Sequence, residues 1–448
     1  MKNFANQKVA VLGFGIEGQD LCRFLLKQKA KITVFDQKEK LPQKESLVCQ
    51  QAGVDFKLGE DCLTKLQGFK FIFRSPGFRR LSPEILQAEK EGAQISSATK
   101  LFFELCLGKI IGVTGTKGKG TTATLIYEIL QKDRQRVFLA GNVGQPMLGL
   151  LPRVQKGDWV VLELSSFQLQ DLTQSPHLAV VLFITSEHLD YHQDKKEYVE
   201  AKANLVRFQK ENDLSVLNAD DLVSSSFAGL TPGKIYCFSR RKKVNGVYVL
   251  KKQIFLFKEK LGSTEQLQLL GEHNWDNVCA ATLAAFLAGA SKEAIKKTIF
   301  SFKGLEHRLE WVRDLKGISF YNDSFSTTPE TTMAAIKSFQ KPIVLIAGGS
   351  EKGSDYTQLG QEITHSTVKT LILIGQMAGK IKKAVLKAGF QGEILFQPAK
   401  TMPAIVELAF KKAPKGGVVL LSPACASFDL FLDYKDRGQQ FKENVQAL

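Results

Sequence analysis

The stretch Ile110-Ile-Gly-Val-Thr-Gly-Thr-Lys-Gly-Lys-Gly-Thr-Thr-Ala-Thr124 joins two segments with different patterns of apolar residues. The apolar run over residues 107–113 predicts a buried strand, and the helical spacing of apolar residues over 121–130 predicts a helix. The glycines between them let the backbone wrap around a phosphate, and the helix N-terminus adds its positive dipole end. The stretch therefore favours a nucleotide-phosphate loop over an incidental glycine-rich turn.

Two positions of this loop depart from the general P-loop pattern. Val113 stands where the pattern has a glycine, and Gly120 stands where it has Ser or Thr after the lysine. Lys119 would place its charge at the β- and γ-phosphates, and Thr121 must then supply the hydroxyl that holds Mg²⁺. We expect the nucleotide to be bound by Gly115, Thr116, Lys117, Gly118, Lys119, Gly120 and Thr121.

Length and composition indicate a soluble, multidomain protein. A chain of 448 residues forms two to four domains, each able to bury its own core. No apolar run approaches the roughly 20 residues of a membrane span, and residues 1–8 lead into an expected strand without the apolar region of a signal peptide. The seven cysteines include no C-x-x-C pair, which argues against a disulfide framework or a zinc site. We therefore expect a cytoplasmic protein.

The chain is strongly basic, with a formal net charge of +16. Such a charge suits either nucleic acid or phosphate-rich small ligands. The basic residues are scattered, for example at 195–196, 240–243 and 411–412, and form no stripe interleaved with aromatic residues. This distribution favours a basic surface with anionic small ligands, and we expect no nucleic-acid partner.

The first hundred residues carry a second glycine motif. Residues 8–18 read as a strand that runs into G-x-G-x-x-G at Gly13, Gly15 and Gly18, and the next strand, 31–36, ends in Asp36. This layout is typical of dinucleotide sites, where Asp36 would reach a ribose or sugar hydroxyl. The motif does not distinguish NAD from another diphosphate. The turn Ser75-Pro76-Gly77, after a further strand, would line the same crevice.

The central region adds candidate metal ligands at strand ends. Glu163 is an acid within the apolar strand 159–168, so it is either an Mg²⁺ ligand or a solvent-facing residue of an edge strand. His188, with Glu187 and Asp190, follows the buried strand 178–185, at the end where open α/β sheets place ligands. Lys202 lies on a helix expected over 197–210, and the sequence alone gives it no role.

The last third of the chain alternates strands and helices again, after a loop with Gly304 as its hinge. Cys425 has no neighbour that resembles a paired base, so we interpret it as a small turn residue. Three successive α/β regions with glycine turns predict ligands in the clefts between domains. We expect an α/β protein of three domains: Rossmann-like over 1–100, a central P-loop ATPase-like parallel sheet over 101–303, and Rossmann-like over 304–448.

A series of motifs in order along nearly the whole chain resembles the Mur ligase family. The motifs are Gly115-Thr-Lys-Gly-Lys-Gly-Thr121, Gly141-Asn-Val-Gly144, Glu163-Leu-Ser-Ser-Phe-Gln168, Glu187-His188, His273-Asn274, His307-Arg308, Tyr321-Asn-Asp-Ser324 and Ala424-Cys-Ala-Ser-Phe-Asp429. This combination is highly specific. The resemblance implies that the first glycine crevice holds a UDP-sugar and not NAD.

The resemblance implies an ATP-dependent amide-bond-forming ligase of peptidoglycan precursor synthesis. ATP would phosphorylate the L-alanine carboxylate of UDP-N-acetylmuramoyl-L-alanine, and the amine of D-glutamate would attack the acyl phosphate. Two Mg²⁺ would offset the negative charge, so that the protein contributes mainly placement and electrostatics. Its partners would be these three small molecules, with no membrane insertion, and we expect a monomer.

The resemblance also implies roles for individual residues. Catalytic roles fall to Lys119, Asn142, Glu163, His188 and Lys202. The metal would be held by Thr121, Glu163, His188 and Lys202, the last as a bridging carbamate. ATP would also be contacted by Asn274, Arg308 and Asp323. The UDP-sugar substrate would be bound by Gly15, Asp36, Gln37, Ser75, Gly77, Asn142, Ser165 and Gln168. The amino acid would be bound by Thr327, Lys352, Ser427, Phe428 and Tyr434.

Three departures from the family pattern keep alternatives open. The P-loop, with Gly120 after the lysine, resembles that of folylpolyglutamate synthases. Phe325 stands where the family pattern has lysine, and Tyr434 replaces a phenylalanine that is common there. One alternative is therefore a related ligase that adds another amino acid, such as L-glutamate. Another is a P-loop NTPase that acts as a nucleic-acid-linked switch or transporter protein, which the scattered basic residues and the complete third region disfavour.

Overall fold

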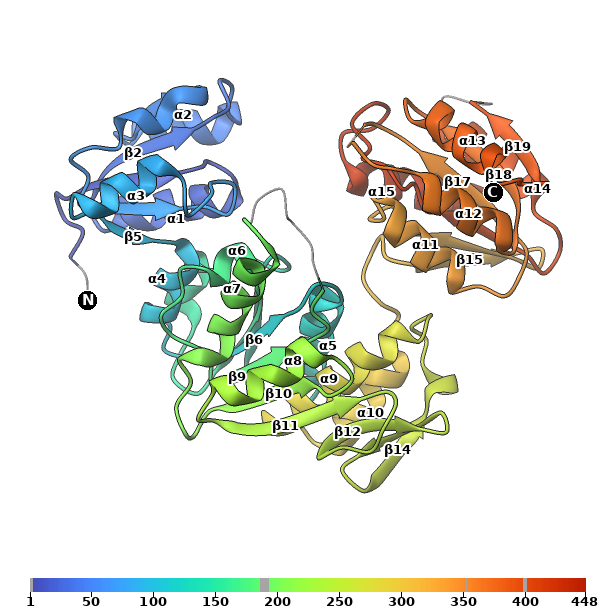
Figure 1. Ribbon diagram of the computed structural model, residues 1–448, viewed down its shortest axis with the longest axis horizontal. Helices are drawn as coiled ribbons and strands as arrows, with labels where there is room; N and C mark the ends of the chain where they lie inside the picture. Colours follow the sequence, from blue (N-terminus) through green and yellow to red (C-terminus); the bar gives the residue numbers. More distant parts are fainter. Residues whose placement is uncertain (1–2, 186–192, 352, 398–400) are drawn as a thin grey trace. The chain divides into compact units, whose positions relative to one another are not determined.

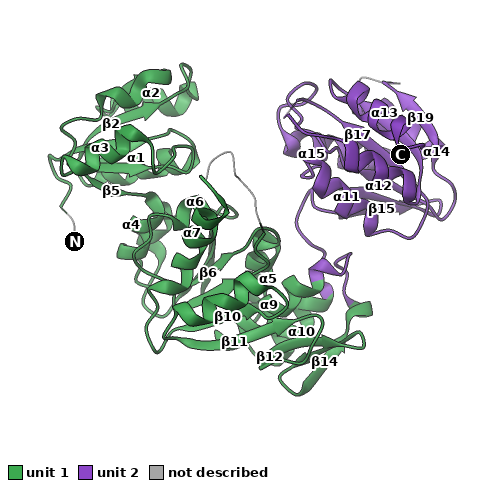
Figure 2. Cartoon of the chain, viewed as in Figure 1, with its two compact units in different colours: residues 1–266, 275–300 green, residues 267–274, 301–448 purple. Residues whose placement is uncertain are grey.

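The computed structural model describes residues 3–185, 193–351, 353–397 and 401–448 (Figure 1). The chain divides into two compact units, Met1–Gln266 with Trp275–Phe300 and Leu267–Asn274 with Ser301–Leu448 (Figure 2). The first unit contains a five-stranded and a nine-stranded sheet, and the second contains a six-stranded sheet. Helices alternate with parallel strands in all three, which confirms the expected α/β class.

The N-terminal sheet is parallel throughout, in the strand order β3-β2-β1-β4-β5. Its strands are β1 Lys8–Leu12, β2 Lys31–Asp36, β3 Asp55–Leu58, β4 Phe71–Arg74 and β5 Gln94–Ser96. Its helical segments are α1 Ile16–Lys27, α2 Gln43–Gln51, the 3₁₀ turn η1 Glu60–Lys65 and α3 Pro83–Lys90. The central strand is β1, which pairs in parallel with β4, so the turns that follow these two strands meet at the carboxyl edge of the sheet.

The central sheet has the order β14-β13-β12-β11-β10-β9-β6-β8-β7. Its strands are β6 Lys109–Thr114, β7 Val137–Gly141, β8 Trp159–Glu163, β9 Leu178–Val181, β10 Leu214–Asn218, β11 Lys234–Ser239, β12 Gly246–Leu250, β13 Gln253–Leu256 and β14 Glu259–Ser263. The strands from β7 to β12 pair in parallel, and β13 and β14 add an antiparallel extension at one edge. The P-loop strand β6 is therefore interior, between β8 and β9.

The helices of the central region connect these strands. They are α4 Ala98–Leu105, α5 Lys119–Lys132, η2 Leu148–Arg153, α6 Ser166–Leu169, α7 Lys195–Arg207, α8 Leu222–Ser226, η3 Phe227–Leu230, η4 Thr264–Gln266, α9 His273–Leu287 and α10 Lys292–Ser301. Gly112 lets α7 approach β6, since a Cβ there would lie 2.7 Å from Leu205 Cδ1. This close packing brings the lysine-bearing helix against the strand that leads into the P-loop.

The C-terminal sheet has the order β15-β16-β20-β17-β18-β19, and only the edge hairpin β15–β16 is antiparallel among its described pairs. Its strands are β15 Glu310–Leu315, β16 Ile318–Asn322, β17 Ile343–Gly348, β18 Val368–Ile374, β19 Glu393–Phe396 and β20 Val418–Leu421. Its helices are α11 Pro329–Lys337, α12 Thr357–His365, α13 Ala378–Lys387, α14 Met402–Lys412 and α15 Tyr434–Ala447. Buried apolar clusters lie on both faces of the sheet.

The strand expected over 31–36 is present at those residues, whereas the bounds of other expected elements differ. The strand expected over 159–168 ends at Glu163, and the helix expected over 197–210 spans Lys195–Arg207. The helix expected from residue 121 starts at Lys119, directly after Gly118. The strand expected over 178–185 ends at Val181, because the next residues bond to the P-loop instead. There Leu182 N donates to Thr114 O, and Thr116 N donates to Phe183 O.

The seven cysteines are all free thiols, spread over the regions of all three sheets. Cys22, Cys49 and Cys62 belong to the N-terminal sheet region, and Cys279 lies in α9. Burial raises the pKa of each of these thiols. Among the described helices, none is both long and apolar enough to cross a membrane.

Candidate functional site

The loop between β6 and α5 has the conformation that the glycine spacing predicts. Gly118 precedes the first turn of α5 in the left-handed region, with φ +85°. A Cβ at this position would lie 2.1 Å from Asn277 Oδ1, so glycine alone fits. Asn277 also accepts a hydrogen bond from Thr122 Oγ1 at 3.3 Å. Helix α9 thus supports the P-loop from behind, a contact that the sequence did not indicate.

Two lysines from different helices contact one carbonyl of the loop. Lys119 Nζ donates to Gly115 O at 3.1 Å and to Thr116 O at 2.9 Å. Lys202 Nζ, from α7, donates to Gly115 O at 2.9 Å and to Thr114 Oγ1 at 3.4 Å. Two ammonium groups at one turn of backbone create a strongly positive site for an anion such as a nucleotide phosphate.

Lys202 is a core residue, which its position on a helix did not reveal. It is only 1% exposed, and its ammonium lies 4.6 Å from the centre of the Tyr198 ring. Tyr198, one turn earlier on α7, shares a hydrogen bond with Thr116 Oγ1 at 3.0 Å. Because burying a lysine costs free energy unless its charge is compensated, the contacts of Lys202 with the P-loop mark it as a functional candidate.

Glu163 lies beside the P-loop strand. It ends β8 in register with Val113 of β6 and is 6% exposed, so the edge-strand interpretation is wrong. Thr121, also buried, is in the first turn of α5. A carboxylate and a hydroxyl are the oxygen ligands that Mg²⁺ prefers, so these donors fit a magnesium site. His188 lies outside the described residues, and the described part of the chain contains no cluster of three His, Cys, Asp or Glu side chains that could hold a metal.

Asn142 is adjacent to Glu163 at the same edge of the sheet. Its backbone N–H donates to Glu163 O at 3.2 Å, directly after β7. The preceding Gly141 has φ +98°, and a Cβ there would lie 2.3 Å from Glu163 O. The glycine turn therefore brings the two catalytic candidates together.

Ser165 and Gln168 form a capping box at the start of α6. Ser165 Oγ accepts from Gln168 N at 3.3 Å, and Gln168 Oε1 accepts from Ser165 N at 2.9 Å. Gln168 Nε2 also donates to Glu17 of α1, a side chain whose pKa burial raises. In this arrangement the two side chains hold α6 and join it to the N-terminal sheet region.

The loop of the N-terminal glycine motif is held by a hydrogen bond to the Asp36 carboxylate. Asp36 Oδ2 accepts from Phe14 N at 2.8 Å, and Oδ1 accepts from Lys38 N at 2.9 Å. Gly13 has φ +93° and faces Ser75, whose Oγ would lie 2.2 Å from an added Cβ. Asp36 thus holds the loop before Gly15, the residue that caps α1.

Gln37 and Gly77 line one pocket of about 280 Å³. The other lining residues are Glu60, Asp61, Leu63, Thr64, Phe78, Arg79, Ser82 and Glu84. The pocket lies beside the turns that follow β2 and β4, where the sequence predicts a sugar-nucleotide site.

In the C-terminal unit, the acid after β16 is buried in a hydrogen-bond network. Asp323 Oδ2 accepts from Ser422 Oγ at 2.7 Å, and Oδ1 accepts from Leu309 N at 3.1 Å. Burial raises the pKa of Asp323 to about 6. Asn274, in the same unit, donates from its side chain to Leu270 O at 2.7 Å.

The two departures from the family pattern in this unit contact each other. Phe325 and Tyr434 pack edge to face with ring centres 5.1 Å apart. The Arg308 guanidinium lies 3.8 Å from the centre of the Phe325 ring. Phe325 therefore supports Arg308 by a cation–π contact, in the place where the family pattern has a lysine.

Arg437 joins two loops that carry amino-acid-binding candidates: a first loop that follows β16 and a second loop that follows β20. Its fully buried guanidinium donates to Ser324 Oγ and O at 2.9 Å each and to Cys425 O and Ala426 O at 3.2 Å each. Burial lowers its pKa to about 10. The half-buried Thr327 follows the first loop. Sequence reasoning missed Arg437, because its role depends on tertiary packing.

The second loop presents side chains of different exposure. Ser427 is buried, whereas Phe428 is 72% exposed and donates its N–H to Ser350 Oγ at 3.2 Å. Cys425 is a buried residue paired with Tyr356 Oη at 3.2 Å, and burial raises its pKa to about 11, which is consistent with a turn residue and not a nucleophile. Lys352 lies outside the described residues.

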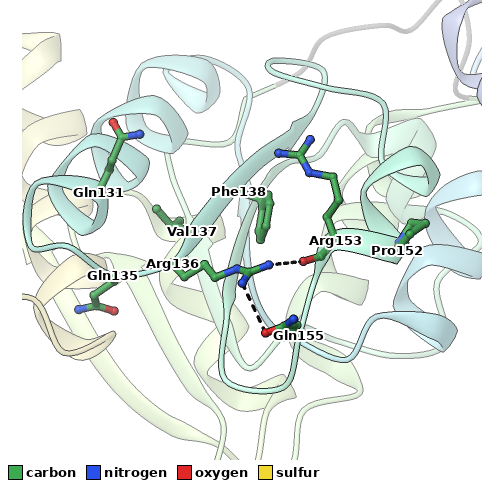
Figure 3. Close-up of a pocket in the computed structure, with 8 residues that line it drawn as sticks. All are labelled: Gln131, Gln135, Arg136, Val137, Phe138, Pro152, Arg153 and Gln155. Atoms are coloured by element: carbon green, nitrogen blue, oxygen red, sulfur yellow. Dashed lines mark hydrogen bonds between the residues drawn. The ribbon is translucent and has the colours of Figure 1, made fainter.

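A larger hollow of about 460 Å³ lies at the start of β7, the opposite end of the sheet from the P-loop (Figure 3). Here the guanidiniums of Arg136 and Arg153 lie 5.8 Å and 5.4 Å from the centre of the Phe138 ring. Arg136 also donates to Arg153 O at 2.7 Å. Because β7 is an edge strand, these charged side chains protect it against pairing with another chain.

Comparison with known protein families agrees with this architecture. The family model of the Mur ligase middle domain matches residues 113–285, that of the Mur ligase glutamate ligase domain matches 307–425, and that of the MurD-like N-terminal domain matches 7–97. The chain belongs to the Mur ligase family. Its P-loop, Glu163 and Lys202 all lie within the Mur ligase middle domain, and Arg308 and Asp323 lie within the glutamate ligase domain.

Similar Mur ligases match over their full length. A protein of Acetivibrio thermocellus named UDP-N-acetylmuramoylalanine--D-glutamate ligase is 41% identical, over 100% of this chain and 98% of its own. Proteins of the same name from Clostridium botulinum and Clostridium kluyveri are 38% identical, over 99% of this chain and 97% of theirs.

Solved Mur ligase structures share the fold. MurF from Acinetobacter baumannii has a TM-score of 0.62 at 16% identity, covering 99% of this chain and 92% of its own. The UDP-N-acetylmuramate-alanine ligase MurC from Thermotoga maritima has a TM-score of 0.61 at 16% identity, covering 99% and 100%. The MurF ligase of Thermotoga maritima, solved in complex with ADP, has a TM-score of 0.55 at 16% identity, covering 99% and 96%.

The close packing at Gly118 gives a first prediction. Gly118→Ala should raise the KM for ATP about tenfold or more, because the methyl group meets Asn277 Oδ1 and the left-handed backbone costs about 1 kcal/mol. Gly157→Ala is the matched control, since Gly157 has φ +100° with no atom within 4 Å of its added Cβ. Steady-state kinetics and thermal unfolding of both variants measure the effect. Equal KM values for ATP in the two variants would contradict the packing argument.

The buried acid after β16 gives a prediction on pH dependence. Because the folded pKa of Asp323 is about 6 and its usual value is 3.8, its contribution to the free energy of unfolding is present below about pH 4 and is lost as pH rises through about 6. Relative to Asp323→Asn, wild type should lose about 3 kcal/mol across this window. Melting temperatures of both proteins at about pH 4.5 and about pH 7.5 test the sign. If the melting temperature of wild type minus that of Asp323→Asn stayed constant or grew with pH, the predicted loss of stability would be wrong.

Proposed function

We propose that the protein is an ATP-dependent ligase that adds D-glutamate to UDP-N-acetylmuramoyl-L-alanine, in peptidoglycan precursor synthesis and thus cell-wall biogenesis. The observation that carries this proposal is the 41% identity to a ligase of that name over the whole of this chain and 98% of the relative. Mur ligases are ATP-dependent amide-bond-forming enzymes, and the P-loop geometry supports the same chemistry here. Lys119, Lys202 and Glu163 come from three elements to one edge of the central sheet.

The first step is phosphoryl transfer to the substrate. The L-alanine carboxylate oxygen attacks the γ-phosphorus of ATP, a new P–O bond forms, and the bond to the leaving ADP breaks. Lys119 and the N–H groups at the start of α5 hold the phosphates in line for this attack. Candidate ATP contacts are the loop residues 115–121 with Asn274, Arg308 and Asp323.

The second step forms the amide bond. The amine of D-glutamate attacks the acyl-phosphate carbonyl, and the tetrahedral intermediate releases phosphate while the amine loses a proton. We assign D-glutamate to the C-terminal unit, at Thr327, Lys352, Ser427, Phe428 and Tyr434. The contacts of Arg437 support this assignment, because they fix the loops on which Thr327 and Ser427 lie.

Mg²⁺ would stabilise the negative charge that accumulates between the phosphates and the carboxylate. We propose two sites, with Thr121, Glu163, His188 and Lys202 as the residues that hold them. The donor chemistry of Glu163 and Thr121 supports this, and Lys202 fits if its amine carries a carbamate, since a free ammonium repels a cation. The Lys202 amine is buried beside the loop, 2.9 Å from Gly115 O, and a carbamate on it would supply oxygen ligands for the metal.

The remaining assignments concern domains and the sugar nucleotide. We propose UDP-sugar binding in residues 1–100, ATP binding in 101–303 and amino-acid binding in 304–448. Candidate UDP-sugar contacts are Gly15, Asp36, Gln37, Ser75, Gly77, Asn142, Ser165 and Gln168. We also propose a cytoplasmic monomer that binds no nucleic acid, in keeping with its composition and scattered basic residues.

The test is phosphate release from ATP in the presence of UDP-N-acetylmuramoyl-L-alanine with D-glutamate, L-glutamate or no amino acid. Release that requires both the sugar nucleotide and D-glutamate is the expected result. A preference for L-glutamate would keep the ligase mechanism but replace the amino acid, and would direct attention to Phe325 and Tyr434. Release indifferent to both substrates would overturn the ligase assignment in favour of a P-loop NTPase.

A further inference from the structure

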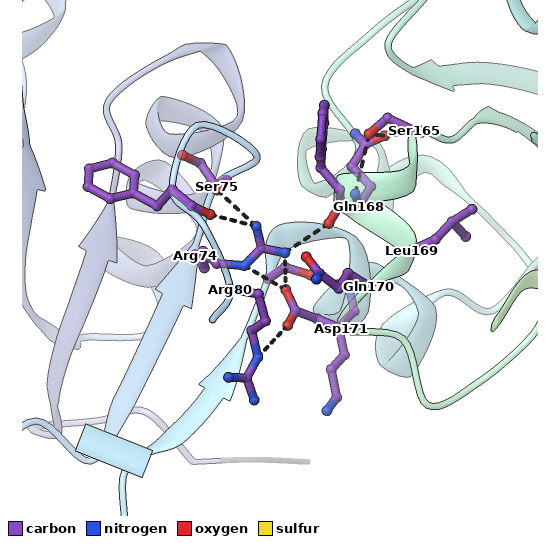
Figure 4. Close-up of polar contacts among 12 residues, drawn as sticks. Arg74, Ser75, Arg80, Ser165, Gln168, Leu169, Gln170 and Asp171 are labelled. Carbon is purple, nitrogen blue, oxygen red and sulfur yellow. Dashed lines mark hydrogen bonds and ion pairs between the residues drawn. The ribbon is translucent and has the colours of Figure 1, made fainter. Parts of the chain in front are cut away.

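A buried arginine lies at the turn of the candidate UDP-sugar crevice. Arg74 ends β4 and enters the turn of Ser75 and Gly77, and it is 2% exposed (Figure 4). Its Nε and Nη2 donate to Asp171 Oδ2 at 3.0 Å and 2.6 Å. Asp171 follows α6 and is 97 residues away in sequence. The pair therefore joins the N-terminal sheet region to the central one.

The rest of the guanidinium contacts backbone on both sides. Nη1 donates to Phe78 O at 2.8 Å and to Ser75 O at 3.5 Å, and Nη2 donates to Phe167 O at 2.8 Å. The arginine thus holds both ends of the 75–78 turn and, through Phe167, the α6 helix itself. A planar guanidinium with fixed donor directions sets the relative position of the three segments.

Asp171 is the group that makes this arrangement stable. It is 8% exposed, and its second oxygen accepts from Arg80 Nε at 3.1 Å. Arg80 in turn donates to both carboxylate oxygens of Glu89, at 2.7 Å and 2.8 Å. A buried guanidinium that loses its carboxylate is left as an uncompensated charge, so replacing Asp171 by a neutral residue would displace Arg74.

We propose that Asp171 is a positioning residue for the UDP-sugar substrate and acts through Arg74. The α6 helix continues from the segment that carries Glu163, so the Arg74–Asp171 pair sets the 75–78 turn relative to the catalytic edge of the central sheet. A displaced 75–78 turn would misalign its contacts with the sugar nucleotide, so the affinity for that substrate would fall. This inference rests on the proposed function, because it takes the 75–78 turn as a substrate contact.

The experiment compares Asp171→Asn with wild type in steady-state kinetics and in calorimetric binding of UDP-N-acetylmuramoyl-L-alanine. We expect the KM and the Kd for the sugar nucleotide to rise about tenfold or more, with the KM values for ATP and D-glutamate within about twofold of wild type. Asp171→Glu, which keeps the charge, should restore much of the affinity. A merely structural role would lower the melting temperature without this selective change.

Two variants serve as controls. Arg80→Gln removes the second ion pair of Asp171 but leaves every contact of Arg74, so the KM for the sugar nucleotide should stay near wild type. Asp158→Asn removes another buried carboxylate paired with an arginine, Arg136 at 3.1 Å, at the far end of the central sheet. It should lower the melting temperature without a selective loss of sugar-nucleotide affinity.

The outcomes separate this inference from the proposed function. An unchanged Kd for the sugar nucleotide in Asp171→Asn, or equal increases in all three KM values, would overturn the positioning role while wild-type turnover leaves the function intact. Wild type that binds the sugar nucleotide without D-glutamate-dependent turnover would overturn the function, and the Kd comparison would still decide the inference. Wild type that does not bind the sugar nucleotide would overturn both.

Discussion

Lys119→Ala is expected to lower kcat for ATP-dependent ligation about 10³-fold with little change in the folded structure. The lysine is held by two loop carbonyls, those of Gly115 and Thr116, so its charge is already placed at the turn before ATP binds. Removing a preorganised charge from the γ-phosphate removes stabilisation that operates mainly in the transition state. Single-turnover phosphate release and ATP binding by calorimetry would separate the loss of chemistry from the loss of affinity.

Lys132→Ala is the matched control for this variant. It removes the same charge from the same helix, α5, at its exposed last turn. The activity of Lys132→Ala should equal that of wild type. Its melting temperature should be similar to that of Lys119→Ala. If Lys119→Ala kept activity comparable to the control, the P-loop assignment would be wrong.

Lys202→Ala should also lose activity about 10³-fold, and short-chain carboxylates should restore part of it. The physical reason is the burial of the amine beside Gly115, where a carbamate would place two oxygens at the phosphate end of the loop. A carboxylate that diffuses into the space left by the side chain can supply similar oxygens. Activity measured against formate and acetate concentration, at constant ionic strength, gives the test.

The control for Lys202→Ala is a second lysine of α7. Lys196→Ala removes an exposed lysine from the same helix and should leave both activity and carboxylate dependence unchanged. Full activity of Lys202→Ala would remove it from the mechanism. Inactivity without rescue, in a variant that melts like wild type, would mean that the ammonium itself is required and that the carbamate proposal is wrong.

The sequence was sufficient where a local pattern decides the structure. The change from an apolar strand to helical spacing around Gly115 and Gly118 predicted β6, α5 and the loop between them. Alternation of strands and helices predicted the α/β class of the whole chain. These features depend on neighbours within a few residues, which is the range over which periodicity and glycine placement carry information.

The remaining parts of the site depend on contacts between distant segments. Lys202 is buried because α7 packs on β6 at Gly112, and Arg437 and Asn277 have roles that only the folded chain reveals. Asp36 and Gln168 were selected for the right chemistry, yet their side chains bond to nearby backbone or to Glu17 in this structure. Short polar side chains at loop and helix starts compete for such local bonds, which a motif cannot show.

Because free thiols occur in each sheet region, the labelling rates of individual cysteines can measure local unfolding of each region separately. Buried thiols with raised pKa values react slowly with alkylating reagents in the folded state, so the labelling rate measures local unfolding. Cys22 and Cys49 report on the N-terminal region, Cys279 on α9 behind the P-loop, and Cys425 on the loop held by Arg437. Pulse labelling followed by peptide mass spectrometry would therefore resolve, in one sample, which region each substrate protects.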